Sequence, residues 1–248
     1  MMIGRILCSF LAGTLTTLGF FFGQALAEPS LEVRVVTESW EPYNYEKDGR
    51  VVGQATEVVR AVLNAAGIGI TGGRIELLPW PRAYRIATTE PDTLIYTILW
   101  TPEREDLFSW VGPIVPAEEF HLYKDALRDD VLVQVVDDAR KYLIGILRDS
   151  VHADYFQSRN FPPESIRPVA NQEQNLAMLL AGRVDLIVDV ESTLALRAAR
   201  MNLPLDRFQK TLFLFRNNHY MAFSPGTDPE IVRRTTQALA EIMAGQED

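Results

Sequence analysis

Cysteine is almost missing from this 248-residue chain, because Cys8 is its single cysteine and lies in the first apolar segment. The remainder has no disulfide or thiolate chemistry, so its stability must come from packing. Histidine is nearly as scarce: His121, His152 and His219 lie far apart, and none has a second ligand at zinc spacing. Phosphate-binding glycine loops and the G-x-S-x-G elbow are also absent. We therefore expect neither a metal nor a cofactor.

Basic charge is in short supply as well. The chain has 24 Lys and Arg against 33 Asp and Glu, a formal net charge of -9. Nucleic acids and anionic membranes are bound through basic surfaces. An acidic protein of this kind is expected to have neither of them as a partner.

The one long hydrophobic run, at 6–22, is broken by Gly13 and Gly19 and falls short of the roughly 20 apolar residues that a membrane span needs. Arg5 precedes this run and Ala-Leu-Ala follows at 25–27, which is the order of a cleavable signal peptide. No lipobox precedes Cys8. We predict a signal peptide over 1–27, cleavage after Ala27, and an untethered, monomeric periplasmic protein.

The rest of the chain alternates between strand and helix patterns, twice over. In the first round, strands are predicted at 33–37, 75–78 and 94–99, with helices at 56–66 and 81–88. In the second, strands are predicted at 143–147, 166–169 and 184–188, with helices from 151, at 172–181 and from 192. Extended segments at 119–124 and 213–223 and a last helix at 229–243 complete the pattern.

This pattern predicts an α/β protein of two lobes, each with a mainly parallel sheet covered by helices on both faces. Lobe 1 would comprise 28–119 and 220–248, and lobe 2 would comprise 120–219. Two extended crossovers would form a hinge between them. In such sheets, ligands bind at the carboxyl ends of the strands and at the helix starts that follow. A small ligand would therefore be enclosed in the cleft between the lobes.

Five short motifs, in this order and spacing, are shared with one known family. They are WEPY at 40–43, Gly53 at the start of the first helix, TPER at 101–104, GILRDS at 145–150 and GRVD at 182–185. On these residues the chain resembles a divergent branch of the periplasmic solute-binding proteins of polar amino acid uptake systems, the bacterial extracellular solute-binding protein family 3. The resemblance covers nearly all of the chain after the signal peptide and implies the type II periplasmic-binding fold.

The resemblance also implies ligand contacts in lobe 1. Arg104 would grip a ligand carboxylate through two parallel hydrogen bonds; taken alone, it would be a surface arginine paired with a neighbouring glutamate. Trp40 would lay an aromatic ring against the ligand, or belong to the core. Thr97 would offer a hydroxyl, or be an ordinary strand threonine. Trp80 would lie near Trp40, and Arg82 would supply a second cationic contact.

In lobe 2, Ser150 and the amide of Val151 open a helix, where free N–H groups suit an anion. Ser150 would equally serve as the helix cap. The family's partner for a ligand ammonium is an aspartate, but Val190 occupies that position here. Asp189 and Glu191 flank it and are the candidates to supply the charge, unless the ligand has no ammonium.

Three functions remain open at this point. The first is a receptor that closes around a small polar metabolite, an amino acid or related carboxylate, and delivers it to a membrane transporter of the ABC type. The second is an exported enzyme on the same fold, resembling a prephenate dehydratase, with Glu38, Asp189 and Glu191 as candidate acids or bases. The third is a sensory ligand-binding module.

Overall fold

The structure, a computed structural model, describes residues 31–245. The predicted signal peptide therefore lies outside the described residues. Within 31–245, no helix is both long and apolar enough to cross a membrane.

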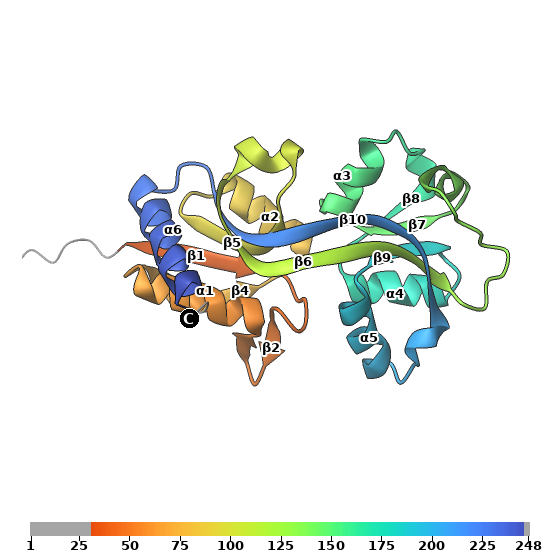
Figure 1. Cartoon of the computed structure of the whole chain (residues 1–248), viewed down its shortest axis with the longest axis horizontal. Helices are drawn as coiled ribbons and strands as arrows, with labels where there is room; N and C mark the ends of the chain where they lie inside the picture. Colours follow the sequence, from red (N-terminus) through yellow and green to blue (C-terminus); the bar gives the residue numbers. More distant parts are fainter. Residues whose placement is uncertain (1–30, 246–248) are drawn as a thin grey trace, which may run out of the picture.

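One half of the molecule, on the left in Figure 1, is built on three parallel strands. Its elements are β1 (Glu32–Thr37), the hairpin of β2 (Tyr45–Lys47) and β3 (Arg50–Val52), α1 (Gln54–Ala65), β4 (Gly69–Leu77), α2 (Trp80–Thr89), β5 (Thr93–Leu99), the 3-10 helix η1 (Pro102–Leu107) and α6 (Pro229–Ala244). Alternate residues of the strands face opposite layers. Val35 and Tyr96 pack in one cluster with residues of α1 and α6, whereas Val36 and Ile95 pack with α2. Both faces of the central strand β5 are covered, and every residue of β5 is buried.

The other half repeats this plan with its own parallel strands. Its elements are η2 (Val136–Lys141), β7 (Ile144–Leu147), α3 (Val151–Gln157), η3 (Pro163–Ser165), β8 (Ile166–Val169), α4 (Gln172–Leu180), β9 (Leu186–Asp189), α5 (Glu191–Arg200) and η4 (Leu205–Arg207). Val188 packs in the cluster that contains α3, and its neighbour Ile187 packs with α4 and α5. Two hydrophobic layers therefore enclose this part of the sheet as well.

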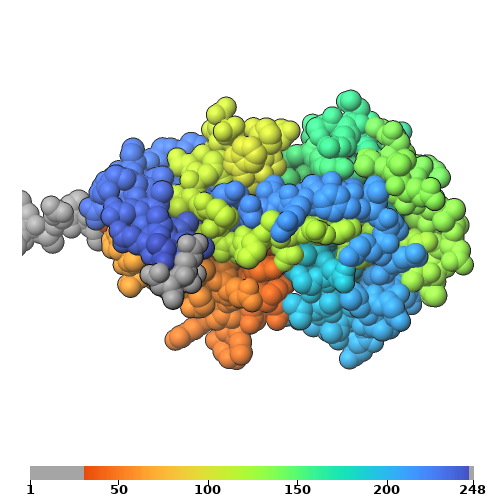
Figure 2. Space-filling model, viewed as in Figure 1, coloured from red at the N-terminus to blue at the C-terminus, as the bar shows by residue number. Residues whose placement is uncertain are grey.

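Two long antiparallel strands, β6 (Ser109–Asp125) and β10 (Phe208–Phe223), run through both lobes (Figure 1). In the first lobe β10 pairs with β5, and in the second β6 pairs with β9. The result is one eight-stranded sheet in the order β4-β1-β5-β10-β6-β9-β7-β8. The extended segments predicted at 119–124 and 213–223 lie within these strands. Figure 2 shows the two lobes in contact on the viewed face, with the crossing strands spanning both.

Most predicted elements form within one or two residues of their expected bounds, and the exceptions have local causes. β4 begins six residues earlier than predicted, because Gly72 and Gly73 both adopt φ 68° and its register against β1 is irregular, which hides the strand's periodicity. The β2–β3 hairpin was not predicted. Its turn is Asp48-Gly49, with φ 51° and 74°, which is the usual turn dipeptide of a two-residue hairpin.

Candidate functional site

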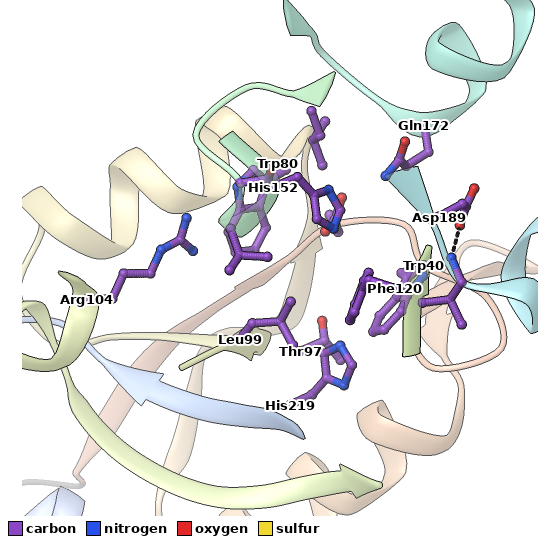
Figure 3. Close-up of a pocket in the computed structure, with 15 residues that line it drawn as sticks. Trp40, Trp80, Thr97, Leu99, Arg104, Phe120, His152, Gln172, Asp189 and His219 are labelled. Carbon is purple, nitrogen blue, oxygen red and sulfur yellow. Dashed lines mark hydrogen bonds between the residues drawn. The ribbon is translucent and has the colours of Figure 1, made fainter. Parts of the chain in front are cut away.

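A pocket lies between the lobes, where the carboxyl ends of their parallel strands face each other (Figure 3). It encloses about 50 Å³ of free space. The first lobe lines it with Glu38, Trp40, Trp80, Thr97, Leu99 and Arg104. The second lobe contributes Leu147, Ser150, Val151, His152, Asp189 and Val190, together with Gln172 at the start of α4. Phe120 of β6 and His219 of β10 complete the lining. Both lobes and both crossing strands therefore meet at one site.

Aromatic rings make up much of this lining. The ring of Trp40 lies 4.3 Å from that of His219, and the ring of Phe120 lies 5.2 Å from that of His152. Trp80 is buried and its indole N–H donates to the carbonyl of Asp149, 2.8 Å away. The polar edge of Trp80 is thereby satisfied, and its ring packs against Tyr84, with 5.6 Å between the ring centres, and lies 5.9 Å from the guanidinium carbon of Arg104.

Thr97 lies at an irregularity in β5. It adopts φ 59°, and the pairing of β5 with β10 shifts register at this point. Its hydroxyl donates to the carbonyl of Tyr96 at 2.5 Å and lies 3.3 Å from the hydroxyl of Thr37. A β-branched residue in the left-handed region is strained, and such strain concentrates at functional sites.

Arg104 is buried, only 2% exposed, and is bound to the opposite lobe. Its Nε and Nη2 donate to one carboxylate oxygen of Asp154 on α3, at 2.9 and 2.7 Å, and Nη2 also donates to the carbonyl of Asp149 at 2.9 Å. The guanidinium carbon lies 4.8 Å from the ring centre of Tyr84. Arg104 therefore joins the lobes through protein groups. A second ion pair, between Glu41 and Arg200 of α5, joins them elsewhere.

Asp189 is held just as completely, on the far side of the pocket from Arg104 (Figure 3). Its carboxylate forms a buried ion pair with Arg197 of α5. One of its oxygens also accepts the hydroxyl of Thr193 at 2.9 Å and the amide N–H of Val190 at 2.7 Å. The negative charge of Asp189 is thus neutralised within lobe 2.

Three other polar side chains of the pocket have unused hydrogen-bonding capacity. Glu38, half-buried just after β1, has no side-chain partner among residues 31–245. Burial raises the pKa of Glu38 to about 8, although the positive charge of Arg197 opposes the rise. Both ring nitrogens of His152 and the Nδ1 of His219 are buried without a partner in this part of the chain. Burial lowers the pKa of each of these imidazoles to about 3, so both rings are neutral.

Of the residues predicted from the sequence, seven line the same pocket: Trp40, Trp80, Thr97, Arg104, Ser150, Val151 and Asp189. Ser150 also caps α3, accepting the N–H of Ala153. The structure does not bring Arg82 and Glu191 to the pocket. Arg82 is exposed on α2, and Glu191 forms an ion pair with Lys210 in a separate surface hollow.

Other pocket residues were missed as ligand contacts. Glu38 follows a strand end and His152 lies in the first turn of a helix, so their positions alone could have indicated them. His219 and Phe120 lie inside the long crossing strands, where no local pattern distinguishes a pocket residue from a core residue. Only the pairing of β6 and β10 brings these two rings to the cleft.

Solved structures superpose on most of this chain. A histidine kinase sensor domain with similarity to periplasmic binding proteins aligns with a TM-score of 0.75 and 17% identity, covering 89% of this chain and 94% of that chain. The arginine-, lysine-, histidine-binding protein ArtJ from Geobacillus stearothermophilus aligns with a TM-score of 0.69 and 17% identity, covering 86% and 91%. The chain has the periplasmic-binding-protein fold.

A third structure with this fold is the GluR0 ligand-binding core from Nostoc punctiforme in complex with L-glutamate, with a TM-score of 0.68 and 16% identity over 86% of this chain and 94% of that chain. No family model and no curated protein matches the sequence. The predicted fold class, an α/β protein of two lobes like the periplasmic binding proteins, is confirmed. Identities this low establish the fold, and the ligand has to be inferred from the pocket itself.

Proposed function

We propose that this protein is a receptor that encloses a small polar metabolite between its lobes and presents it to a membrane transporter or a sensor. The observation that carries the proposal is the pocket lined by both lobes, in which buried side-chain polar atoms of His152 and His219 have no partner among residues 31–245. Buried polar groups are normally hydrogen-bonded, so unpaired ones in a pocket favour a ligand that supplies the missing bonds.

Proteins of both kinds occur among the structures that share the fold. ArtJ is named as an arginine-, lysine-, histidine-binding protein, and another is titled as the substrate-binding protein of an amino acid ABC transporter. The histidine kinase domain is a sensor. Together with the predicted signal peptide, they support a role outside the cytoplasm, in uptake or in sensing.

An exported enzyme is the second candidate function. The pocket leaves it one candidate for the catalytic acid or base. Of the carboxyl groups considered for acid or base work, Asp189 is neutralised by Arg197 and Glu191 lies elsewhere, paired with Lys210. Among the described residues Glu38 alone of these carboxyl groups has no ion-pair partner, and its raised pKa, about 8, suits proton transfer near neutral pH. Recovery of a bound ligand unchanged after incubation favours the receptor, whereas its conversion favours the enzyme.

The receptor proposal is tested by a thermal-shift screen of amino acids, organic acids and amines. A ligand present at 100 times its Kd stabilises by about 2.7 kcal/mol, which for a protein of this size raises Tm by roughly 5–10 °C. Leu99→Trp, inside the pocket, should abolish this shift. Leu196→Trp, on the exposed side of α5, is the matched control and should keep it. The proposal fails if no compound stabilises the protein or if Leu99→Trp binds as the wild type does.

A further inference from the structure

The two charged groups that would hold an amino acid are already paired inside the protein. For Arg104 to receive a ligand carboxylate, the carboxylate of Asp154 would have to leave both Nε and Nη2. Asp154 would then remain next to the incoming carboxylate as a like charge without a partner. A carboxylate ligand therefore has to displace an equivalent group that the protein itself supplies.

At the opposite end of the pocket, the charge of Asp189 is likewise already paired with groups of the protein. Arg197, Thr193 and the amide of Val190 all donate to its carboxylate. An ammonium group at this place would face a carboxylate whose charge is neutralised by a buried guanidinium. Neither Arg104 nor Asp189 is therefore available to bind the carboxylate or the ammonium group of a zwitterionic amino acid.

Among the described residues, Glu38 is the one carboxyl group of the pocket that a protein cation does not bind directly. Burial raises its pKa to about 8, so near neutral pH it ionises when a cation such as an ammonium group pairs with it. The neutral rings of His152 and His219 add nitrogen acceptors, since a neutral imidazole has one nitrogen that accepts a hydrogen bond. The acceptors among these groups are satisfied by a ligand that carries several N–H donors, whereas the one N–H of each neutral ring remains a donor toward the pocket. A protonated amine carries three N–H donors on one atom.

The remaining walls suit a small cation with an apolar body. Trp40 and Phe120 present aromatic rings, which attract a cation over their faces, whereas the ring of Trp80 already lies 5.9 Å from the guanidinium carbon of Arg104. The free space, about 50 Å³, limits the ligand to a small molecule. The net charge of -9 also favours the approach of a cation over that of an anion.

From these contacts we infer that the pocket binds a compact amine that has no carboxylate, with its ammonium group on Glu38 and its apolar part against the aromatic rings. His152 and His219 supply further acceptors for its N–H groups. Asp154 occupies Arg104 permanently and excludes carboxylates from that end. The inference rests on the receptor function proposed above and specifies the class of ligand.

The test uses matched triplets that share an alkyl or aryl part: ethylamine, alanine and propionate; isobutylamine, valine and isovalerate; phenethylamine, phenylalanine and hydrocinnamate. Titration calorimetry with the wild-type protein should show at least one amine binding tenfold or more tightly than its amino acid and its acid. Equal or tighter binding of the amino acid or the acid overturns the inference while the receptor proposal stands. If no member of any triplet binds, the inference is wrong, and the broad screen described above decides separately on the receptor.

Two variants, each with a matched control, test which residues contact the ligand. Glu38→Gln should weaken amine binding at least tenfold, whereas Glu46→Gln, an exposed glutamate of β2, should leave it unchanged. Asp154→Asn should raise affinity for the acid of the triplet, because Arg104 becomes available, and Asp137→Asn, in an exposed pair with Arg140, should not. Unchanged amine binding in Glu38→Gln, or no gain for the acid in Asp154→Asn, contradicts the inference. Circular dichroism of each variant verifies its fold.

Discussion

Arg104 and Asp154 face each other across the cleft, with Nη2 of the arginine 2.7 Å from a carboxylate oxygen of the aspartate. Arg104 is on η1 in the first lobe and Asp154 is on α3 in the second. Because the arginine side chain is only 3% exposed, its charge has lost nearly all contact with water. The pair therefore both neutralises a buried charge and fastens the two lobes together.

The strength of this link is measurable by a double-mutant cycle. We expect the variants Arg104→Met and Asp154→Asn to show a coupling free energy of about 1–3 kcal/mol in urea unfolding, since the pair is largely desolvated. The exposed pair of Arg140 and Asp137, treated in the same way, should give no more than about 0.5 kcal/mol. Equal coupling in the two cycles would show that Arg104 and Asp154 do not interact as described.

Removing the partner of Asp189 should be among the most damaging single changes. Arg197→Met leaves a carboxylate that is only 4% exposed without its cation, and we expect the free energy of unfolding to fall by about 3–5 kcal/mol. Arg233→Met, whose partner Glu230 is exposed, is the control and should cost less than about 1 kcal/mol. Chemical denaturation distinguishes the two; a loss in Arg197→Met no larger than the control's would argue against a buried ion pair.

Burial of His152 makes the free energy of unfolding depend on pH. Its pKa is about 3 in the folded protein, lowered mainly by burial and further by the charge of Arg104, against 6.5 for an ordinary histidine. The unfolded chain therefore takes up a proton below pH 6.5 while the folded ring stays neutral, so stability is lost as the pH falls from 6.5 toward 3. Between pH 7 and pH 5, this group should cost about 2 kcal/mol.

The substitution His152→Phe should remove that share of the pH dependence, because phenylalanine fits among Phe120 and Phe215 and takes up no proton. Urea unfolding at pH 7 and pH 5 gives the comparison. Phe215→Leu, which loosens the same cluster without removing a titrating group, should retain the wild-type dependence. If His152→Phe loses as much stability on acidification as the wild type, the assignment to His152 is wrong.

Gly53 supports the turn that carries Trp40 and Tyr43. It adopts φ 122°, and a Cβ at this position would lie 2.4 Å from the carbonyl oxygen of Tyr43. We expect Gly53→Ala to lower the free energy of unfolding by at least about 2 kcal/mol, since both the backbone angle and the close contact oppose a side chain. Gly49→Ala, with φ 74° and open space around it, should cost about 1 kcal/mol. Similar losses of stability in the two variants, measured by thermal denaturation, would contradict the close approach of Gly53 to Tyr43.

Local patterns in the sequence determined the order and type of nearly all the elements. Apolar residues at period two and at helical spacing defined the strands and helices, because each element must bury one or both faces regardless of its partners. Since ligands in α/β proteins meet strand ends, seven pocket residues were also found in advance, among them Arg104 and Asp189.

Only the tertiary structure decided what these charges are able to bind. Asp154 reaches Arg104 from 50 residues further along the chain, and Arg197 reaches Asp189 from the second turn of α5. Neither pairing follows from a local pattern, because it depends on how α3 and α5 are placed against the strand ends. The sequence thus determined that charged residues would meet in a cleft, whereas the fold determined that Arg104 and Asp189 are each neutralised by a protein partner, while Glu38, His152 and His219 line the pocket with unused hydrogen-bonding capacity.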